Sequence, residues 1–209
     1  IDGDGDLDAF IGNGDGNTLV YLNIGSANNP TFAAPITNPY GLTDVGSFAA
    51  PNFVDIDGDG DLDAFIGNGD GNTLVYLNIG SANNPTFAAP ITNPYGLTDV
   101  GSFAAPNFVD IDGDGDLDAF IGNGDGNTLV ALNTDNANNP TFAAPTTNPY
   151  GLTNVGNFSA LNFVDIDGDG DLDAFISNDY GDTLYFNNGG WVAPVNATTV
   201  DGTYGVGAV

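Results

Sequence analysis

The residues best suited to chemistry in this chain are aspartates, which are concentrated in short glycine-containing loops. In the stretch FVDIDGDGDLDAFIG, from Phe53 to Gly67, five aspartates fall within nine residues. They occupy alternate positions, so their side chains can converge on one point, and Gly60 permits the sharp turn that this requires. Carboxylate oxygens at this spacing are typical of a calcium site.

Electrostatic repulsion within the loop also favours a bound cation. The chain has 28 acidic residues, all of them Asp, and no Lys, Arg or His, which gives a formal charge of −28. Two carboxylates about 4 Å apart repel by roughly 4 kcal/mol at an effective dielectric constant of about 20. We therefore expect the loop to open without a cation. A solvated acidic turn or a halophilic surface is the alternative, but neither needs a fixed DxDxDGxxD spacing, and either would use Glu as well.

The ligands of each site follow from positions in the loop. We expect side-chain ligands from positions 1, 3, 5 and 9, with position 9 bidentate, and a backbone carbonyl from position 7, which together supply the 6 to 8 oxygens that Ca²⁺ prefers. The sequence predicts three complete calcium sites and one that lacks its position-1 ligand, since the first loop begins at Ile1. The predicted metal-site residues are Asp2, Asp4, Asp6 and Asp8; Asp55, Asp57, Asp59, Asp61 and Asp63; Asp110, Asp112, Asp114, Asp116 and Asp118; and Asp165, Asp167, Asp169, Asp171 and Asp173.

The loops belong to an internal repeat. The string IDGDGDLDAFI begins at Ile1, Ile56, Ile111 and Ile166, a fixed period of 55 residues. Such a period is typical of stacked units, none of which buries its apolar face alone. In the second unit we expect four strands, beginning at Asn52, Asp63, Thr73 and Thr86, with a long connection from residue 91 to the next unit.

The fold class is therefore all-β, with four tandem four-stranded blades in a β-propeller-like arrangement that is closed, partial or a stacked array. The predicted units are residues 1–51, which lack a first strand, 52–106, 107–161, and 162–209, which end in a divergent tail. The loops GNGDGNT at Gly12, Gly67 and Gly122 are expected to be hairpin turns and not a second set of cation sites. Three tyrosines of the recurring NPYGLT segment, Tyr40, Tyr95 and Tyr150, are expected to anchor the connections between blades.

Composition excludes several classes of protein. Hydrophobic residues make up 41 % of the chain, enough to bury a core, while the straight-chain helix formers Glu, Lys, Arg, Gln and Met are absent. No run approaches the roughly 18 apolar residues of a membrane-spanning helix. A polyanion without basic residues is repelled by phosphate backbones and anionic lipids, so we expect neither nucleic-acid binding nor membrane insertion.

The segment DIDGDGDLDAFIGN, followed by GNTLVYLN and preceded by GSFAAPNF, resembles the FG-GAP and VCBS repeats of bacterial surface proteins and integrin-like β-propellers. The resemblance covers about residues 1 to 188. It implies four-stranded blades that hold Ca²⁺ between the first and second strands, in secreted or cell-surface proteins.

The functional hypothesis is a secreted or cell-surface structural or adhesive module stabilised by calcium, whose partners are copies of itself or matrix components. Assembly into a filament by strand complementation is part of this hypothesis, with TTVD of the tail supplying Asp201 as the missing position-1 ligand. The alternative is a calcium-dependent carbohydrate-binding propeller, with Trp191 as the one tryptophan able to stack on a sugar. Catalysis is not expected, because His, Cys, Lys, Arg and Glu are absent; Asp44, Asp99 and Asp182 are the acids that it would require outside the loops.

Overall fold

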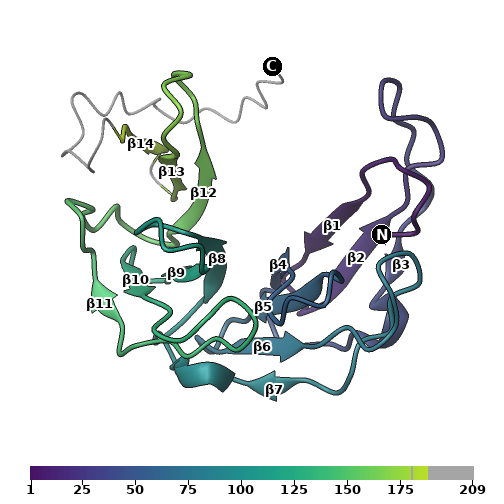
Figure 1. Cartoon of the computed structure of the whole chain (residues 1–209), viewed down its shortest axis with the longest axis horizontal. Helices are drawn as coiled ribbons and strands as arrows, with labels where there is room; N and C mark the ends of the chain where they lie inside the picture. Colours follow the sequence, from purple (N-terminus) through teal and green to yellow (C-terminus); the bar gives the residue numbers. More distant parts are fainter. Residues whose placement is uncertain (180, 188–209) are drawn as a thin grey trace.

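The computed structural model describes residues 1–179 and 181–187 and has one antiparallel sheet for each repeat. The four sheets follow one another along an open arc, and the described residues do not close into a ring (Figure 1). Repeat 1 contains β1 (Ala9–Gly12), β2 (Thr18–Tyr21) and β3 (Ile36–Thr37); repeat 2 contains β4 (Ala50–Val54), β5 (Asp63–Gly67), β6 (Thr73–Tyr76) and β7 (Ile91–Thr92). Repeat 3 contains β8 (Ala105–Val109), β9 (Asp118–Gly122), β10 (Thr128–Ala131) and β11 (Thr146–Thr147); repeat 4 contains β12 (Ala160–Val164), β13 (Asp173–Ser177) and β14 (Thr183–Tyr185).

Each sheet is a meander in which consecutive strands pair, as in the order β4-β5-β6-β7. The expected all-β class and the one-sheet-per-repeat organisation are confirmed. In the described part of the chain the only helical segments are two short 3₁₀ turns, η1 (Pro39–Gly41) and η2 (Pro94–Gly96), both in connections between repeats. No helix among these residues is long and apolar enough to cross a membrane.

The fourth strand of each sheet lies later in the sequence than predicted. We expected it to begin at Thr86, but β7 is Ile91–Thr92, which pairs with Leu74 and Val75. The segment around Thr86 makes only an isolated antiparallel bridge, between Phe87 and Asn78 just past the end of β6. The Phe87 amide also donates to the Tyr40 carbonyl of repeat 1 (2.8 Å). This part of the chain therefore continues the pairing briefly and contacts the preceding repeat, while the two residues after Pro90 form the fourth strand.

The hairpin between the second and third strands is a tight turn, as expected. Asn68 Oδ1 accepts the amides of Asp70 (3.1 Å) and Asn72 (3.0 Å), and Gly71 adopts a positive φ of 85°. These side-chain bonds add to the backbone bond from the Asn68 amide to the Asn72 carbonyl (2.9 Å). The NGDGN segments of repeats 2 and 3 are accounted for by this turn, since Asn123 makes the same two bonds.

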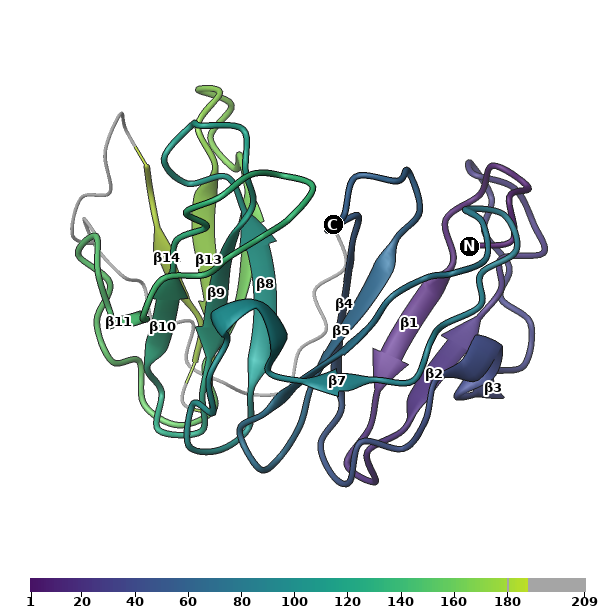
Figure 2. The same cartoon turned by 60° about the horizontal axis from the view of Figure 1, so that its bottom comes forward.

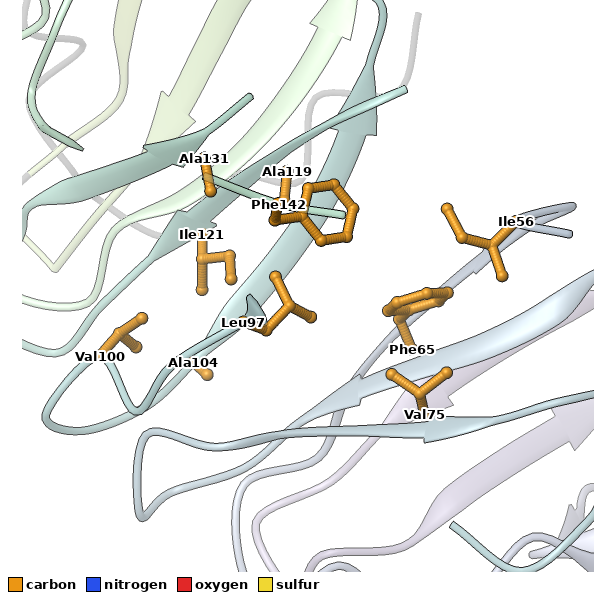
Figure 3. Close-up of a cluster of buried hydrophobic side chains, with 10 residues drawn as sticks. All are labelled: Ile56, Phe65, Val75, Leu97, Val100, Ala104, Ala119, Ile121, Ala131 and Phe142. Carbon is orange, nitrogen blue, oxygen red and sulfur yellow. The ribbon is translucent and has the colours of Figure 1, made fainter. Parts of the chain in front are cut away.

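The hydrophobic core lies between sheets, not within them. One cluster joins Phe65 and Val75 of repeat 2 to Ala119 and Ile121 of repeat 3, with Leu97 of the connecting segment also in the cluster (Figure 3). Phe65 packs edge-on against Phe108, with ring centroids 4.5 Å apart. All five residues of β5 are buried, and so are all five of β9, which fits sheets covered on both faces. Each repeat therefore depends on its neighbours for burial, as the period predicted.

Repeat 4 departs from the strict 55-residue period by one residue. In repeat 2, Tyr76 pairs with Ala64, while in repeat 4 it is Tyr185 that pairs with Ala174. The period alone would place Tyr185 opposite Phe175. The hairpin before β14 is thus effectively one residue shorter, and the slip brings a tyrosine to the buried position that Tyr76 occupies.

Candidate metal centre

The aspartate loops of repeats 2, 3 and 4 connect the first two strands of their sheets, the first loop leads into β1, and all of them lie at one end of the molecule, the upper end in Figure 2. Val54, the last residue of β4, pairs with Asp63, the first residue of β5. This register brings Asp55 and Asp63 back together at the end of the sheet, although eight positions separate them in the sequence. The pairing of β4 with β5 therefore determines the width of the loop, and residues 56–62 must curl inward.

Carboxylates within the loop form that curl by accepting backbone amides. Asp55 accepts the amides of Gly58 (2.8 Å) and Gly60 (3.0 Å), and Asp59 accepts the amide of Asp61 (2.9 Å). The same bonds recur in the loops of repeats 3 and 4. Gly58 and Gly60 have positive φ values of 74° and 94°, a backbone conformation that glycine adopts without strain.

Three carboxylates meet in each complete loop. The side chains at positions 1, 3 and 9 each offer an oxygen, and these oxygens all lie within 4.8 Å of one another. The triads are Asp55, Asp57 and Asp63; Asp110, Asp112 and Asp118; and Asp165, Asp167 and Asp173. Positions 5 and 7 lie outside the triads: Asp59, Asp61, Asp114, Asp116, Asp169 and Asp171.

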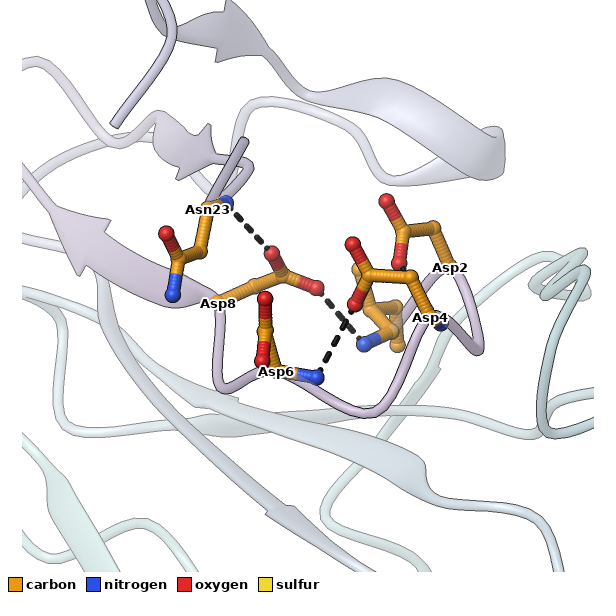
Figure 4. A network of polar contacts seen from close by, with 6 residues as sticks. Asp2, Asp4, Asp6, Asp8 and Asn23 are labelled. Atoms are coloured by element: carbon orange, nitrogen blue, oxygen red, sulfur yellow. Dashed lines mark hydrogen bonds and ion pairs between the residues drawn. The ribbon is translucent and has the colours of Figure 1, made fainter. Parts of the chain in front are cut away.

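The first loop keeps the bonds of the position-9 aspartate but has no position-1 aspartate (Figure 4). Asp8 accepts the backbone amide of Asn23 (2.7 Å) and the terminal ammonium group of Ile1 (2.7 Å). Asp4 accepts the amide of Asp6 (2.9 Å), as in the other loops. Asp2, Asp4, Asp6 and Asp8 form no triad among the described residues. Asp201, which we predicted as the missing ligand, and Trp191 lie outside the described residues.

The position-9 aspartate is the buried member of each triad. Asp63 and Asp118 are each 1 % exposed, and Asp173 is fully buried. Burial raises the pKa of Asp63 to about 6, against hydrogen bonds from Asn78 and Ile56 that lower it, while Asp57 and Asp59 raise it further. Burial likewise raises the pKa of Asp118. Burial beside other carboxylates makes the charge of this group costly, and the chain has no basic side chain to offset the cost, so a bound cation would stabilise the charged form.

The structure adds an asparagine that the sequence analysis missed. The Asn78 amide donates to Asp63 Oδ1 (2.7 Å), and the Asn133 amide donates to Asp118 Oδ1 (2.7 Å). In repeat 4 the Asn187 amide donates to Asp173 Oδ1 (2.8 Å). Asn187 lies one residue before the position that the 55-residue period predicts, because of the register slip in repeat 4. The recurring LN pair after the third strand was the available signal. It was not informative, because the backbone amide and not the side chain makes the contact.

The tyrosine of the NPYG segment lies beside the aspartate loop of its own repeat. Burial raises the pKa of Tyr95, and the nearby carboxylates of Asp63 and Asp57 raise it further. Burial has the same effect on Tyr150, with contributions from Asp118 and Asp112. These tyrosines are therefore close to the triads as well as part of the connection to the next repeat.

The donor set fits a hard divalent cation. Each triad consists of carboxylate oxygens without nitrogen or sulfur, and such ligands suit Ca²⁺, Mg²⁺ or Mn²⁺ in preference to zinc or copper. Bound there, a cation would neutralise the buried carboxylate. Asp55, Asp57 and Asp63, with their equivalents in repeats 3 and 4, are the residues that would hold it.

Comparison with known families agrees with the fold and the repeat. The family model for the FG-GAP-like repeat matches residues 1–66, 55–121 and 110–176 in tandem. The chain belongs to the FG-GAP-like repeat family, as its sequence resemblance predicted. No curated protein sequence matches the chain.

Among solved structures, the chain is similar to the Photorhabdus luminescens Tc holotoxin pore carrying the mutation TccC3-D651A. The two share 21 % sequence identity at a TM-score of 0.44, and the match covers 83 % of this chain. It covers 8 % of the toxin chain, so this protein spans a small fraction of its structural neighbour's length.

Proposed function

We propose that this chain is a calcium-stabilised structural or adhesive repeat module that works outside the cell. The observation that carries the proposal is the threefold recurrence of an aspartate triad, each with a buried member, in a chain of charge −28 without basic residues. FG-GAP-like repeats are typical of extracellular proteins, which supports this location. The open arc of sheets is consistent with part of a propeller or with a stacked array. The proposed role is structural and not catalytic, because His, Cys, Lys, Arg and Glu are absent and most of the aspartates are better suited to bind a metal ion.

Calcium fits the loops better than magnesium does. Each loop offers a triad, further carboxylates at positions 5 and 7, and backbone carbonyls, which is more oxygen than the near-ideal octahedron of Mg²⁺ accommodates. Extracellular modules commonly bind Ca²⁺ with dissociation constants of about 10⁻⁴–10⁻³ M. Sites of this affinity would be filled outside a cell and largely vacant in calcium-poor solution.

Calorimetric titration tests the proposal. We expect Ca²⁺ to bind at three or more sites, with Mg²⁺ much weaker, and Asp57→Asn to reduce the number of sites by one. At a calcium concentration of about 100 times the dissociation constant, losing one site removes about 2.7 kcal/mol of stabilisation. Asp70→Asn is the matched control, since Asp70 lies in the hairpin turn and belongs to no triad. No calcium heat, or the same loss from both variants, would contradict the proposal.

Self-assembly by strand addition is the second part of the proposal. Among the described residues β1 is the edge strand of its sheet, whereas its equivalents β5, β9 and β13 pair with a preceding strand. Ile11 on β1 is 50 % exposed, while its equivalent Ile66 is fully buried. A strand like β4 from another copy would cover both the edge and this side chain.

Light scattering and electron microscopy with and without a calcium chelator test the assembly. We expect calcium-dependent oligomers that Ile11→Asp dissociates, because a buried aspartate without a partner opposes the docked strand. Ile24→Asp is the control, since Ile24 is 68 % exposed and lies outside the strands. A protein that stays monomeric under all conditions would refute self-assembly, while the proposal of calcium binding would still stand.

A further inference from the structure

In repeats 2 and 3, the segment between the third and fourth strands projects toward the preceding repeat. We call it the tip segment; it comprises residues 78–87 in repeat 2 and 133–142 in repeat 3. Figures 1 and 2 both show the tip segment between β10 and β11 reaching from repeat 3 toward repeat 2. Its position places it between the aspartate loops of two consecutive repeats.

The base of each tip segment is bonded to the aspartate loop of its own repeat. The Asn133 amide donates to Asp118 Oδ1 (2.7 Å). The Asn133 side-chain oxygen accepts the amides of Asp135 (3.3 Å) and Thr141 (3.0 Å), which closes the segment on itself. Asn78 makes the equivalent bonds to Asp63, Gly80 and Thr86. One asparagine thus joins the buried triad member to the tip segment.

The far end of each tip segment contacts the aspartate loop of the preceding repeat. The Asn138 side chain lies directly over Gly58, where any Cβ would collide with it, and Asn83 lies over Gly3 in the same way. Gly58 stands between Asp57 and Asp59 in the loop of repeat 2. The contact is therefore with the metal-binding loop itself.

A backbone hydrogen bond fixes the same joint. The Phe142 amide donates to the Tyr95 carbonyl (2.7 Å), and the Phe87 amide donates to the Tyr40 carbonyl (2.8 Å). Phe142 is 4 % exposed and belongs to a core cluster that also contains Ile56 of the repeat 2 loop. Tyr95 packs against this cluster. The joint thus combines an amide contact, a hydrogen bond and buried apolar surface.

We propose that each tip segment is a strut that couples the calcium sites of consecutive repeats. Calcium orders the loop of repeat 2, the ordered loop holds Asn138 and Phe142, and the strut transmits this order to Asp118 through Asn133. The inference rests on the calcium binding proposed above. By linkage, occupation of one site raises the affinity of the next, and a coupling of about 1–3 kcal/mol corresponds to about 5- to 150-fold in affinity.

Hydrogen exchange measured by mass spectrometry tests the coupling on the full chain. The tip of repeat 3, TDNANNPTF (134–142), differs in sequence from the tips of repeats 1 and 2, which are identical, so its peptides are assignable. We expect calcium to slow exchange in residues 134–142 by about fivefold or more. Asp57→Asn, which damages the site of repeat 2, should abolish this protection in repeat 3. Asp167→Asn, in the site of repeat 4, should leave it intact.

Two further variants separate contact from binding. Asn138→Ala should abolish the protection of residues 134–142 and leave the number of calcium sites unchanged. Gly58→Ala should also abolish the protection of residues 134–142, whereas Gly168→Ala should not: both glycines have positive φ, 74° and 79°, but no described residue approaches Gly168.

Calorimetry on the same samples distinguishes the two ways of failing. If Asp57→Asn loses one calcium site while residues 134–142 stay protected, the strut is refuted and calcium binding stands. If the wild-type chain binds no calcium, the proposed function fails and the strut fails with it.

Discussion

At the scale of single residues, the position-9 aspartate determines how the site responds to its surroundings. Asp63 is buried and accepts two backbone amides, from Asn78 (2.7 Å) and Ile56 (3.2 Å), while Asp57 approaches it from the exposed side of the loop. The hydrogen bonds orient the carboxylate, and burial makes its charge costly. A proton and a calcium ion therefore compete for the same group.

This competition predicts opposite pH responses with and without calcium. Burial raises the pKa of Asp63 from 3.8 to about 6, so the folded protein binds this proton more tightly than the unfolded chain does. Without calcium, stability should therefore rise as the pH falls from about 7 to 5. With calcium, it should fall over the same range as protons displace the ion. Thermal unfolding followed by circular dichroism measures both trends.

Asp63→Asn provides the control, because it removes one titrating group and should make both curves less steep in this range, while the triads of repeats 3 and 4 still contribute. A calcium-free protein that loses stability between about pH 7 and 5 would show that Asp63 does not titrate as its burial implies.

At the scale of elements, a tyrosine at the end of the third strand joins the sheets of repeats 2 and 4 to the connection before them. The hydroxyl of Tyr76 is hydrogen-bonded to Thr43 Oγ1 (2.8 Å), and that of Tyr185 to Thr153 Oγ1 (2.9 Å). Repeat 3 has Ala131 at this position, beside Thr98 and a cavity of about 10 Å³, roughly the space of one water molecule. The tyrosine is therefore a joint between repeats that repeat 3 lacks.

We expect Tyr76→Phe to cost about 1 kcal/mol through the lost hydrogen bond. Tyr76→Ala should cost about 3–5 kcal/mol, because it also leaves a cavity between two repeats. Urea denaturation in excess calcium measures both effects. Tyr21 occupies the same position in repeat 1 but is only half-buried, so Tyr21→Phe should change stability much less. Equal effects at the two positions would contradict the role given to Tyr76.

At the scale of the whole molecule, the hydrophobic core is divided into clusters between neighbouring sheets. The same chain carries a formal charge of −28. Each core cluster draws on two neighbouring repeats, so the loss of one interface exposes surface on both. Mutual repulsion of the aspartates opposes the compact arc, and bound cations would offset it at the loops. The fold and its ions should therefore be inseparable at low ionic strength.

Small-angle X-ray scattering tests this dependence. Removing calcium at low salt should expand the chain toward the radius of gyration of about 50 Å expected when a chain of this length is unfolded. Adding about 1 M NaCl should partly reverse the expansion, since it shortens the screening length to about 3 Å. In calcium, the same salt should change the radius little. A chain equally compact in all four conditions would show that repulsion does not limit folding.

Sequence periodicity was enough to predict an all-β chain of four repeats, because each 55-residue unit carries its own strand and turn signals. The alternate spacing of Asp55, Asp57 and Asp63 likewise identified the loop. Sequence placed the fourth strand at Thr86, where the structure has only an isolated bridge between Phe87 and Asn78, because the Phe87 amide bonds to the Tyr40 carbonyl of the neighbouring repeat. Sequence also could not reveal the one-residue slip that brings Tyr185 opposite Ala174.

The sequence by itself determined which residues can bind a cation; the tertiary structure decided which of them meet. Spacing puts five aspartates in one loop, but the register of β4 and β5 brings only positions 1, 3 and 9 together. The structure alone places Asn138 over Gly58, because this contact joins residues of different repeats. Local chemistry repeats with the sequence, whereas contacts between repeats depend on how the sheets pack.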